Sequence, residues 1–222
     1  MKRVFITGGA RGIGRAVAEC YRAAGWEVVA PGRDELDLSR PDAVEAYIAR
    51  HGGVLEVDAL VNNAGINNII PIRDLELSDW QLMQDVNLTA PLLLTRHAAA
   101  AMARKGWGRI VNISSCYSFV TRGGRAAYSA TKAALNSLTR SAAVEYGRDG
   151  ILVNAVCPGF IGTDLTRKNN SPEELAALCA QVPLGRLGTP EEIAGLVFML
   201  GSEANSYITG QTLVIDGGYL AQ

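Results

Sequence analysis

The chain has 222 residues, of which 48% are hydrophobic and 19% are charged, and its formal net charge is −1. This length is enough to bury the core of one α/β domain, and the balanced charge indicates neither a nucleic-acid partner nor a membrane-surface partner. The four cysteines are scattered and there are only two histidines, which disfavours both a zinc site and a disulfide framework, so we expect no metal.

The N-terminus leads directly into a segment with a chemical signature. Residues 4–6 are typical of a short buried strand, the glycine-rich segment 7–14 follows at once, and a helix then runs to about Ala24 before Gly25. Glycines between a strand and a helix let a pyrophosphate approach the backbone amides of the helix N-terminus. Residues 7–14 therefore predict a dinucleotide-binding loop. No room remains before it for a signal peptide, and no apolar run reaches transmembrane length, so we expect a cytoplasmic protein.

Strand and helix patterns then alternate along the rest of the chain. Strands are expected at residues 27–30, 57–61, 109–113, 151–156 and 213–215, and helices at 42–50 with Ser39 as candidate cap, from a capping box at 78–81 towards Met102, at 126–146, and after capping boxes at 171–174 and 189–192. This alternation predicts one doubly wound, parallel, Rossmann-type α/β sheet with helices on both faces. We expect a single domain over residues 1–222, with a small substrate lid at about 163–190.

The connection after the second predicted strand is unusually short. Only a few residues separate Ala30 from Glu35, whereas a parallel crossover takes about a dozen or more. The third strand is therefore expected to be short or absent, which leaves the second strand at or near an edge of the sheet.

Residues 114–132 carry side chains that together suggest catalysis. Tyr128 and Lys132 are four residues apart and share one face of a helix, so the ammonium is expected to lower the pKa of the phenol and make it a general acid/base. Ser115 ends a predicted strand, where its hydroxyl could hydrogen-bond a substrate oxygen, while its neighbour Ser114 faces the other way. The alternative is that this Tyr/Lys pair serves only the surface of a helix.

Five motifs in this order closely resemble the short-chain dehydrogenase/reductase family: the glycine loop, Asn-Asn-Ala-Gly at 62–65, the strand-end serine, Tyr-x-x-x-Lys, and Pro-Gly at 158–159. The segments 185–193 and 207–218 look most like 3-oxoacyl-[acyl-carrier-protein] reductases and their paralogues. The chain departs from the family between residue 30 and Asn62, where about one helix and its flanks are missing.

The resemblance implies an NAD(P)(H)-dependent oxidoreductase that transfers hydride between nicotinamide and a carbonyl or secondary alcohol, possibly a 3-oxoacyl thioester. Tyr128 would exchange the proton, Lys132 would assist it and hold the nicotinamide ribose, Ser115 would position the reacting oxygen, and Asn87 would support a water relay. The cofactor residues that it implies, besides Tyr128 and Lys132, are Gly8, Arg11, Gly12, Ile13, Gly14, Asp37, Leu38, Asn63, Ala64, Gly65, Pro158, Gly159, Ile161 and Thr163.

The choice between the two dinucleotides rests on the end of the second strand. NAD-specific sites usually place Asp or Glu there, but Gly32 stands near that position and Arg33 follows it. Arg33, with Arg11 from the other side, could bind a 2′-phosphate, so we expect a preference for NADP(H), with NAD(H) possible. Asp34 or Glu35 could reverse that preference, or both arginines could merely be exposed.

The substrate and two other functions remain open at this stage. A non-catalytic dinucleotide sensor or a redox-neutral epimerase or dehydratase has the same broad fold. Candidate pocket walls are residues 67–70, 116–119 and 165–182. Arg122 and Arg125 either meet an anionic carrier or are solvated.

The helices expected at 78–103 and 126–147 bear on assembly. They carry more apolar and alanine residues than covering one sheet face requires, and in the family they pair between subunits. A homo-oligomer, a tetramer or a dimer, is therefore expected.

Overall fold

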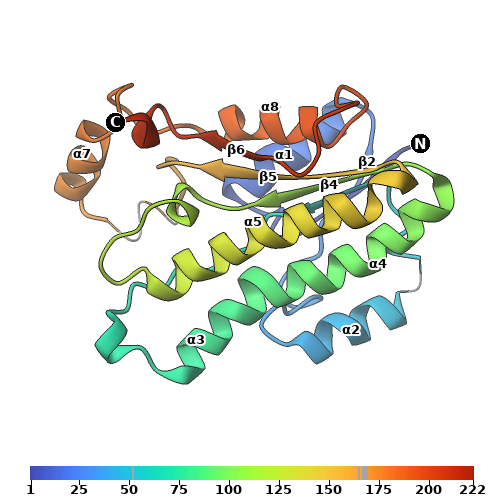
Figure 1. The fold of residues 1–222 in the computed structure, drawn as a ribbon, viewed down its shortest axis with the longest axis horizontal. Helices are drawn as coiled ribbons and strands as arrows, with labels where there is room; N and C mark the ends of the chain where they lie inside the picture. Colours follow the sequence, from blue (N-terminus) through green and yellow to red (C-terminus); the bar gives the residue numbers. More distant parts are fainter. Residues whose placement is uncertain (52, 165, 167–169) are drawn as a thin grey trace.

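The computed structural model describes residues 1–51, 53–164, 166 and 170–222, and it forms one parallel sheet with helices on both faces (Figure 1). The six strands follow the order β2-β1-β3-β4-β5-β6. Their bounds are β1 Arg3–Ile6, β2 Glu27–Val29, β3 Ala59–Asn62, β4 Gly108–Ile113, β5 Ile151–Pro158 and β6 Thr212–Ile215. The predicted Rossmann-type α/β architecture is confirmed.

The helices form two layers, one on each face of the sheet (Figure 1). Their bounds are α1 Gly12–Ala23, α2 Pro41–Arg50, α3 Leu77–Gln84, α4 Ala90–Lys105, α5 Ala126–Tyr146, α7 Pro172–Ala180 and α8 Pro190–Leu200. Helices α1 and α8 pack on one face, while α2, α4 and α5 pack on the other. No helix within the described residues is both long enough and apolar enough to cross a membrane.

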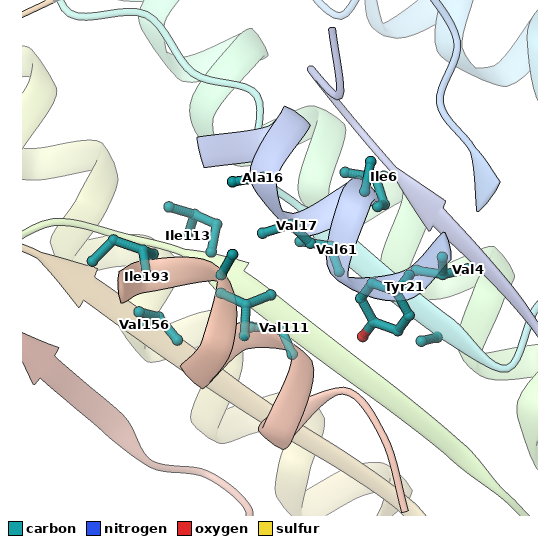
Figure 2. Packing of buried hydrophobic residues seen from close by; sticks show 14 of the residues in the cluster. Val4, Ile6, Ala16, Val17, Tyr21, Val61, Val111, Ile113, Val156 and Ile193 are labelled. Atoms are coloured by element: carbon teal, nitrogen blue, oxygen red, sulfur yellow. The ribbon is translucent and has the colours of Figure 1, made fainter. Parts of the chain in front are cut away.

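Strand β1 shows how the sequence supplies both layers. Val4 and Ile6 belong to the core beneath α1 and α8, whereas Phe5 between them belongs to the core beneath α2 and α4. Successive side chains of a strand point to opposite faces, so a continuous apolar run is what a strand covered on both faces requires. Figure 2 shows the first of these cores, with Tyr21 of α1 and Ile193 of α8 over the strands.

The expectation about the missing third strand is confirmed. Residues 30–40 form turns and no strand, and β2 lies at the edge of the sheet beside β1. The chain turns back at Gly32, whose carbonyl accepts from the amides of Glu35 and Leu36, and Leu36 is buried in the core beneath α2. Because β2 connects through α2 directly to β3, the crossover changes face, and the sheet order reverses at β1.

Two predicted caps are wrong. Arg40 precedes α2, and Ser39 instead donates from its amide and hydroxyl to Asp37 Oδ1 at 3.0 and 2.7 Å, which closes a turn before the helix. Helix α3 begins at Leu77, so the proposed cap Ser78 already lies inside the helix. The residue in the cap position is Glu76, whose side chain makes no capping hydrogen bond. The capping boxes of α7 and α8, at Ser171 and Thr189, are present as predicted.

The long helix expected towards Met102 is interrupted. Between α3 and α4, residues Asp85–Thr89 form a π-helical turn. Pro91, in the first turn of α4, has no amide hydrogen, and its ring crowds the carbonyl of Asn87 four residues before it. A widened turn relieves that conflict, and it presents the Asn87 side chain to the neighbouring elements.

Candidate active site

The glycine loop between β1 and α1 fits the diphosphate of a dinucleotide. Gly8 and Gly12 have positive φ angles of 67° and 53°. A Cβ on Gly14 would lie 2.2 Å from the carbonyl oxygen of Gly8, so only glycine allows this close approach. The first turn of α1 has no acidic residue, and Arg11 before it makes no side-chain cap, so the helix N-terminus remains suited to an anion.

The turn after β3 is held against this loop. The Thr7 hydroxyl accepts hydrogen bonds from the amides of Asn63 and Ala64, both at 3.0 Å. The Asn63 side chain donates to the carbonyls of Thr7 and Gly8 at 2.9 and 3.2 Å. Thr7 was not predicted as a site residue, although its position at the end of β1, directly before the glycine loop, was the available signal.

The shortened segment after β2 contains the residues expected to contact the adenosine, and we call this part of the site the adenosine end. The Arg33 side chain is 83% exposed, and its Nε lies 4.0 Å from Asp37 Oδ1. Hydrogen bonds from the hydroxyl and amide of Ser39 hold the pKa of Asp37 below its usual value, with a smaller contribution from Arg33. Asp37 is therefore engaged mainly by Ser39, and Arg33 keeps most of its surface in solvent.

The predicted catalytic side chains come from the end of β4 and from α5, and we call this part of the site the reaction end. Ser115 follows β4, and its Oγ accepts from the Tyr117 amide at 3.2 Å. Ser114 faces the other way and donates to the Lys132 carbonyl at 3.1 Å. Lys132 Nζ donates to the Ile113 carbonyl at 2.8 Å and lies 5.7 Å from the centre of the Tyr128 ring. Ser115, Tyr128 and Lys132 therefore meet at the carboxyl end of β4.

The expectation that the pKa of Tyr128 is lowered is wrong, because it left out burial. Burial raises the pKa of Tyr128 to about 12, and a hydrogen bond with Ser115 only partly opposes the rise. Burial also lowers the pKa of Lys132 to about 8, because a buried ammonium loses hydration. Desolvation is the largest effect on the phenol, so Tyr128 carries its proton at neutral pH.

Asn87 joins three segments near this centre. From the π-helical turn its side chain accepts from the Ile66 amide and donates to the Ile66 carbonyl, both at 2.9 Å, and it donates to Thr131 Oγ1 at 3.2 Å. A Cβ on Gly65 would lie 3.2 Å from Asn87 Oδ1 and 3.4 Å from Lys132 Nζ. Asn87 and Lys132 thus both lie next to Gly65, where any side chain larger than that of glycine would approach them. The water relay itself stays a prediction.

One cleft of about 810 Å³ connects the two ends, a size suited to a cofactor and a small substrate. Every cofactor residue expected from the sequence lines it, together with Ser115; Asn87 stands behind the lining. Of the expected pocket walls, Asn67, Asn68, Cys116, Tyr117, Thr166, Asn170 and Leu178 line the cleft, whereas Phe119 is 55% exposed. Within the expected lid, residues 165 and 167–169 lie outside the described residues.

Next to the reaction end, the cleft has an aromatic wall, and we call this part the substrate end. Of its rings, only that of Tyr117 was among the pocket walls expected from the sequence. The Tyr117 ring lies 6.3 Å from that of Tyr128 and 6.2 Å from that of Phe160, each in an edge-to-face arrangement. Tyr219 continues the row 4.9 Å beyond Phe160. Phe160 was missed because it follows the Pro-Gly pair, where no periodic pattern marks a pocket residue.

His97 and two of the cysteines have partners or surroundings that do not suggest catalysis. His97 is on α4, where it contacts Glu45 of α2 at 3.0 Å. Cys116 and Cys157 are buried and unpaired, and burial raises the pKa of the Cys116 thiol to about 11.

Comparison with known proteins places the chain in a family. A family model described as "Enoyl-(Acyl carrier protein) reductase" matches residues 33–220. The 3-oxoacyl-[acyl-carrier-protein] reductase of Aquifex aeolicus is 39% identical over 96% of this chain and 95% of its own length. The gluconate 5-dehydrogenase of Gluconobacter oxydans is 35% identical over 97% of this chain and 93% of its own.

Solved structures agree with these relatives. A Beutenbergia cavernae protein assigned as an NAD(P)-dependent gluconate 5-dehydrogenase, with NADP bound at low occupancy, matches with a TM-score of 0.94 at 37% identity, covering 100% of this chain and 97% of that one. A 4-hydroxyisoleucine dehydrogenase in complex with NADH matches with a TM-score of 0.93 at 32% identity, covering both chains fully. The chain therefore belongs to the short-chain dehydrogenase/reductase family, as its motifs predicted, and it is an oxidoreductase of the nicotinamide-dependent kind.

Proposed function

We propose that this oxidoreductase reduces a ketone, or oxidises the matching secondary alcohol, with Tyr128 as the proton-transferring group and NADP(H) as the preferred cofactor. The observation that carries the proposal is the meeting of Ser115, Tyr128 and Lys132 in the same cleft as the glycine loop. The bound nicotinamide supplies or accepts the hydride.

Each side chain has a separate part in the reduction. Ser115 holds the carbonyl oxygen beside the Tyr128 hydroxyl. As the carbonyl carbon gains hydride, its oxygen takes the phenolic proton, and the Tyr128 phenolate that remains is stabilised by the Lys132 ammonium. The raised pKa of Tyr128, about 12, suits this direction because the phenol enters the reaction protonated. Oxidation of the alcohol reverses the same proton transfer.

The preference for NADP(H) rests on the segment after β2. Strand β2 ends at Val29 and no acidic residue stands at its end. Arg33 and Arg11 both line the cleft, while Asp34 and Glu35 do not. A guanidinium can form two charge-assisted hydrogen bonds to a phosphate, which supports recognition of the 2′-phosphate by these arginines.

A carbonyl panel tests the reaction. Wild-type protein is mixed with NADPH and with ketones that include acetoacetyl thioesters, keto sugar acids and steroid-like ketones, and cofactor oxidation is followed by absorbance. The relatives named as 3-oxoacyl-[acyl-carrier-protein] reductases and gluconate 5-dehydrogenases justify the first two classes. Cofactor binding without oxidation on any member would favour the sensor, and conversion without net cofactor oxidation would favour a redox-neutral enzyme.

The proposal includes assembly into a homo-oligomer, a tetramer or a dimer. Val144 on α5 is 84% exposed and Leu92 on α4 is 45% exposed, so both long helices present apolar side chains away from the core. A second copy of the chain would bury them. Light scattering at micromolar concentration measures the assembly, and a monomer there rejects this part.

The segment 163–190 is proposed as a lid over the substrate end. Leu178 of α7 lines the cleft, and Gln181, just after α7, accepts a hydrogen bond from Arg122 on the opposite wall. Deletion of residues 172–180 with a glycine linker should raise KM for the ketone more than KM for the cofactor. An equal rise in both KM values would reject the lid.

A further inference from the structure

The turn that leads into α5 places two arginines at the substrate end of the cleft. Arg122 and Arg125 flank Gly123 and Gly124, and both line the cleft next to Tyr128. Gly124 has a φ of 77°, its carbonyl accepts from the Ile70 amide at 3.0 Å, and a Cβ on it would lie 2.8 Å from Ile69 Cγ2. The turn is therefore fixed against the opposite loop, and the two arginines have a defined position.

Arg125 is held beside the reacting group but its charge is not satisfied. Its guanidinium carbon lies 5.6 Å from the centre of the Tyr117 ring, and that ring is the neighbour of Tyr128. Its Nη1 is buried and makes no hydrogen bond within the described residues. A buried donor without a partner is costly, so this nitrogen is suited to a ligand that accepts a hydrogen bond.

Arg122 lies on the same wall. Its guanidinium carbon is 5.3 Å from the centre of the Phe160 ring, and it donates to Gln181. Neither Arg122 nor Arg125 forms an ion pair with an acidic side chain of the described residues, whereas Arg186 is paired with Glu192 at 2.7 Å. The first turn of α5 also contains no acidic residue. Two cations at the substrate end are thus left for a partner from outside the chain.

Two acidic side chains of the described residues line the cleft. Asp37 belongs to the adenosine end and is engaged by Ser39. Asp164 belongs to the segment proposed as a lid, and its side chain is exposed. The two arginines therefore outnumber the acidic side chains at the substrate end, which favours an anion there.

We propose that Arg125, assisted by Arg122, binds a carboxylate of the substrate, so that the natural substrate is an oxo acid or the corresponding hydroxy acid. A guanidinium binds a carboxylate through two parallel hydrogen bonds, and the single ring between Arg125 and Tyr128 sets the carboxylate a few bonds from the reacting carbon. A thioester carrier would have its phosphate at the far end of a long arm, so an anion this close to Tyr128 is part of a small molecule. This inference rests on the proposed ketone reduction and names its substrate class.

The test compares keto acids with their uncharged methyl esters. Acetoacetate, 4-oxopentanoate and 5-oxohexanoate are each measured against the ester with NADPH, in wild type, Arg125→Gln, Arg125→Lys and Arg122→Gln. The matched control is Arg148→Gln, since Arg148 is exposed just beyond the other end of α5. In wild type at least one acid should have a higher kcat/KM than its ester.

Arg125→Gln should lower kcat/KM for that acid about ten- to a hundredfold, because a charge-assisted contact is lost, and should change kcat/KM for the ester by less than about threefold. Arg125→Lys should recover part of the loss. Arg122→Gln should lower kcat/KM for the acid by a smaller factor. Equal losses on acid and ester, or esters that react faster than acids in wild type, would overturn the carboxylate site.

A binding measurement separates this inference from the redox reaction. Calorimetric titration of the NADP+-loaded protein with the same keto acids and esters reports the carboxylate site without turnover, because NADP+ carries no hydride to transfer to a ketone. Binding of an acid that Arg125→Gln abolishes, with no cofactor oxidation, would keep the site and reject the ketone reduction. Oxidation of NADPH by ketones with no discrimination between acid and ester would keep the reaction and reject the site.

A further assay with a thioester tests whether the arginines instead bind the phosphate of a carrier. If Arg125→Gln and Arg122→Gln lower kcat/KM for acetoacetyl-coenzyme A but not for the keto acids, the arginines contact the phosphate of a carrier. In that case the carboxylate assignment is wrong.

Discussion

Lys132 and Arg33 are cations of the same cleft, yet Lys132 is 3% exposed while the side chain of Arg33 is 83% exposed. Lys132 belongs to α5, which packs on the sheet; its Nζ is held by the Ile113 carbonyl and lies beside Gly65. Arg33 follows an edge strand, and its one ion-pair partner among the described residues is Asp37, at 4.0 Å. The reaction end is thus enclosed by several elements, and the adenosine end is formed by one short segment.

Because of this difference, we expect substitutions to have different costs at the two ends. A change at the reaction end alters groups that have lost their hydration and depend on fixed partners, so its cost is large. A change at the adenosine end alters groups that water already solvates, so its effect is confined to cofactor affinity and choice. The following variants test that contrast, beginning with the largest expected effect.

Tyr128→Phe should lower turnover about a hundred- to ten-thousandfold, since the proton donor is removed while the ring and its contacts remain. Binding of the dinucleotide, measured by fluorescence titration, should persist because the glycine loop is untouched. A variant that keeps most of the wild-type kcat would contradict the assignment of Tyr128 as the acid.

Lys132 predicts a pH dependence. Its pKa of about 8 lies below its ordinary value, so the ammonium is lost as pH rises through about 8, and kcat/KM for ketone reduction should fall over the same range. A flat profile between about pH 7 and 9.5 would show that the charge of Lys132 does not matter.

Lys132→Arg keeps a charge that does not titrate in this range, but the larger guanidinium cannot take the buried position of Nζ. We expect activity to fall about a hundredfold, with the remaining activity no longer decreasing near pH 8. Activity near that of wild type would mean that any cation suffices at this position.

Arg33→Ala should lower kcat/KM for NADPH about tenfold and change that for NADH by less than about twofold, since one exposed contact with a 2′-phosphate is lost. Arg15→Ala is the matched control, because Arg15 is an exposed arginine on α1 that pairs with Glu19 at 3.6 Å. Equal losses with the two cofactors, or a wild type that prefers NADH, would reject the proposed preference.

Ser39→Ala removes the hydroxyl contact to Asp37 and should lower the free energy of unfolding by about 0.5–1.5 kcal/mol. KM for the cofactor should rise, because the turn lines the adenosine end. At saturating NADPH, kcat should stay within about twofold of wild type, because the reaction end does not touch this turn. A loss in kcat at saturation would show that the two ends are coupled.

The sequence by itself determined the elements whose causes are local. Alternating apolar runs, the capping boxes at Ser171 and Thr189, and the glycines between β1 and α1 predicted the strands, two helix starts and the dinucleotide loop. The short connection after Ala30 was enough to predict the missing third strand, because a parallel crossover cannot be made from so few residues. Ordered motifs also predicted the family, and with it the lining of the cleft.

Only the tertiary structure decided features whose causes come from remote elements. The pKa of Tyr128 rises because β4, α5 and the loops around them remove water from it, which the spacing to Lys132 cannot reveal. The π-helical turn follows from Pro91 within a helix that must still bring Asn87 to Ile66 and Thr131. The sequence left open whether Arg125 meets an anion or is solvated. The proposal that it binds a carboxylate depends on the Tyr117 ring beside it and on its buried Nη1, which makes no hydrogen bond within the described residues. Desolvation and the choice of hydrogen-bond partners depend on contacts between segments that are distant in the sequence, and local sequence patterns do not specify those contacts.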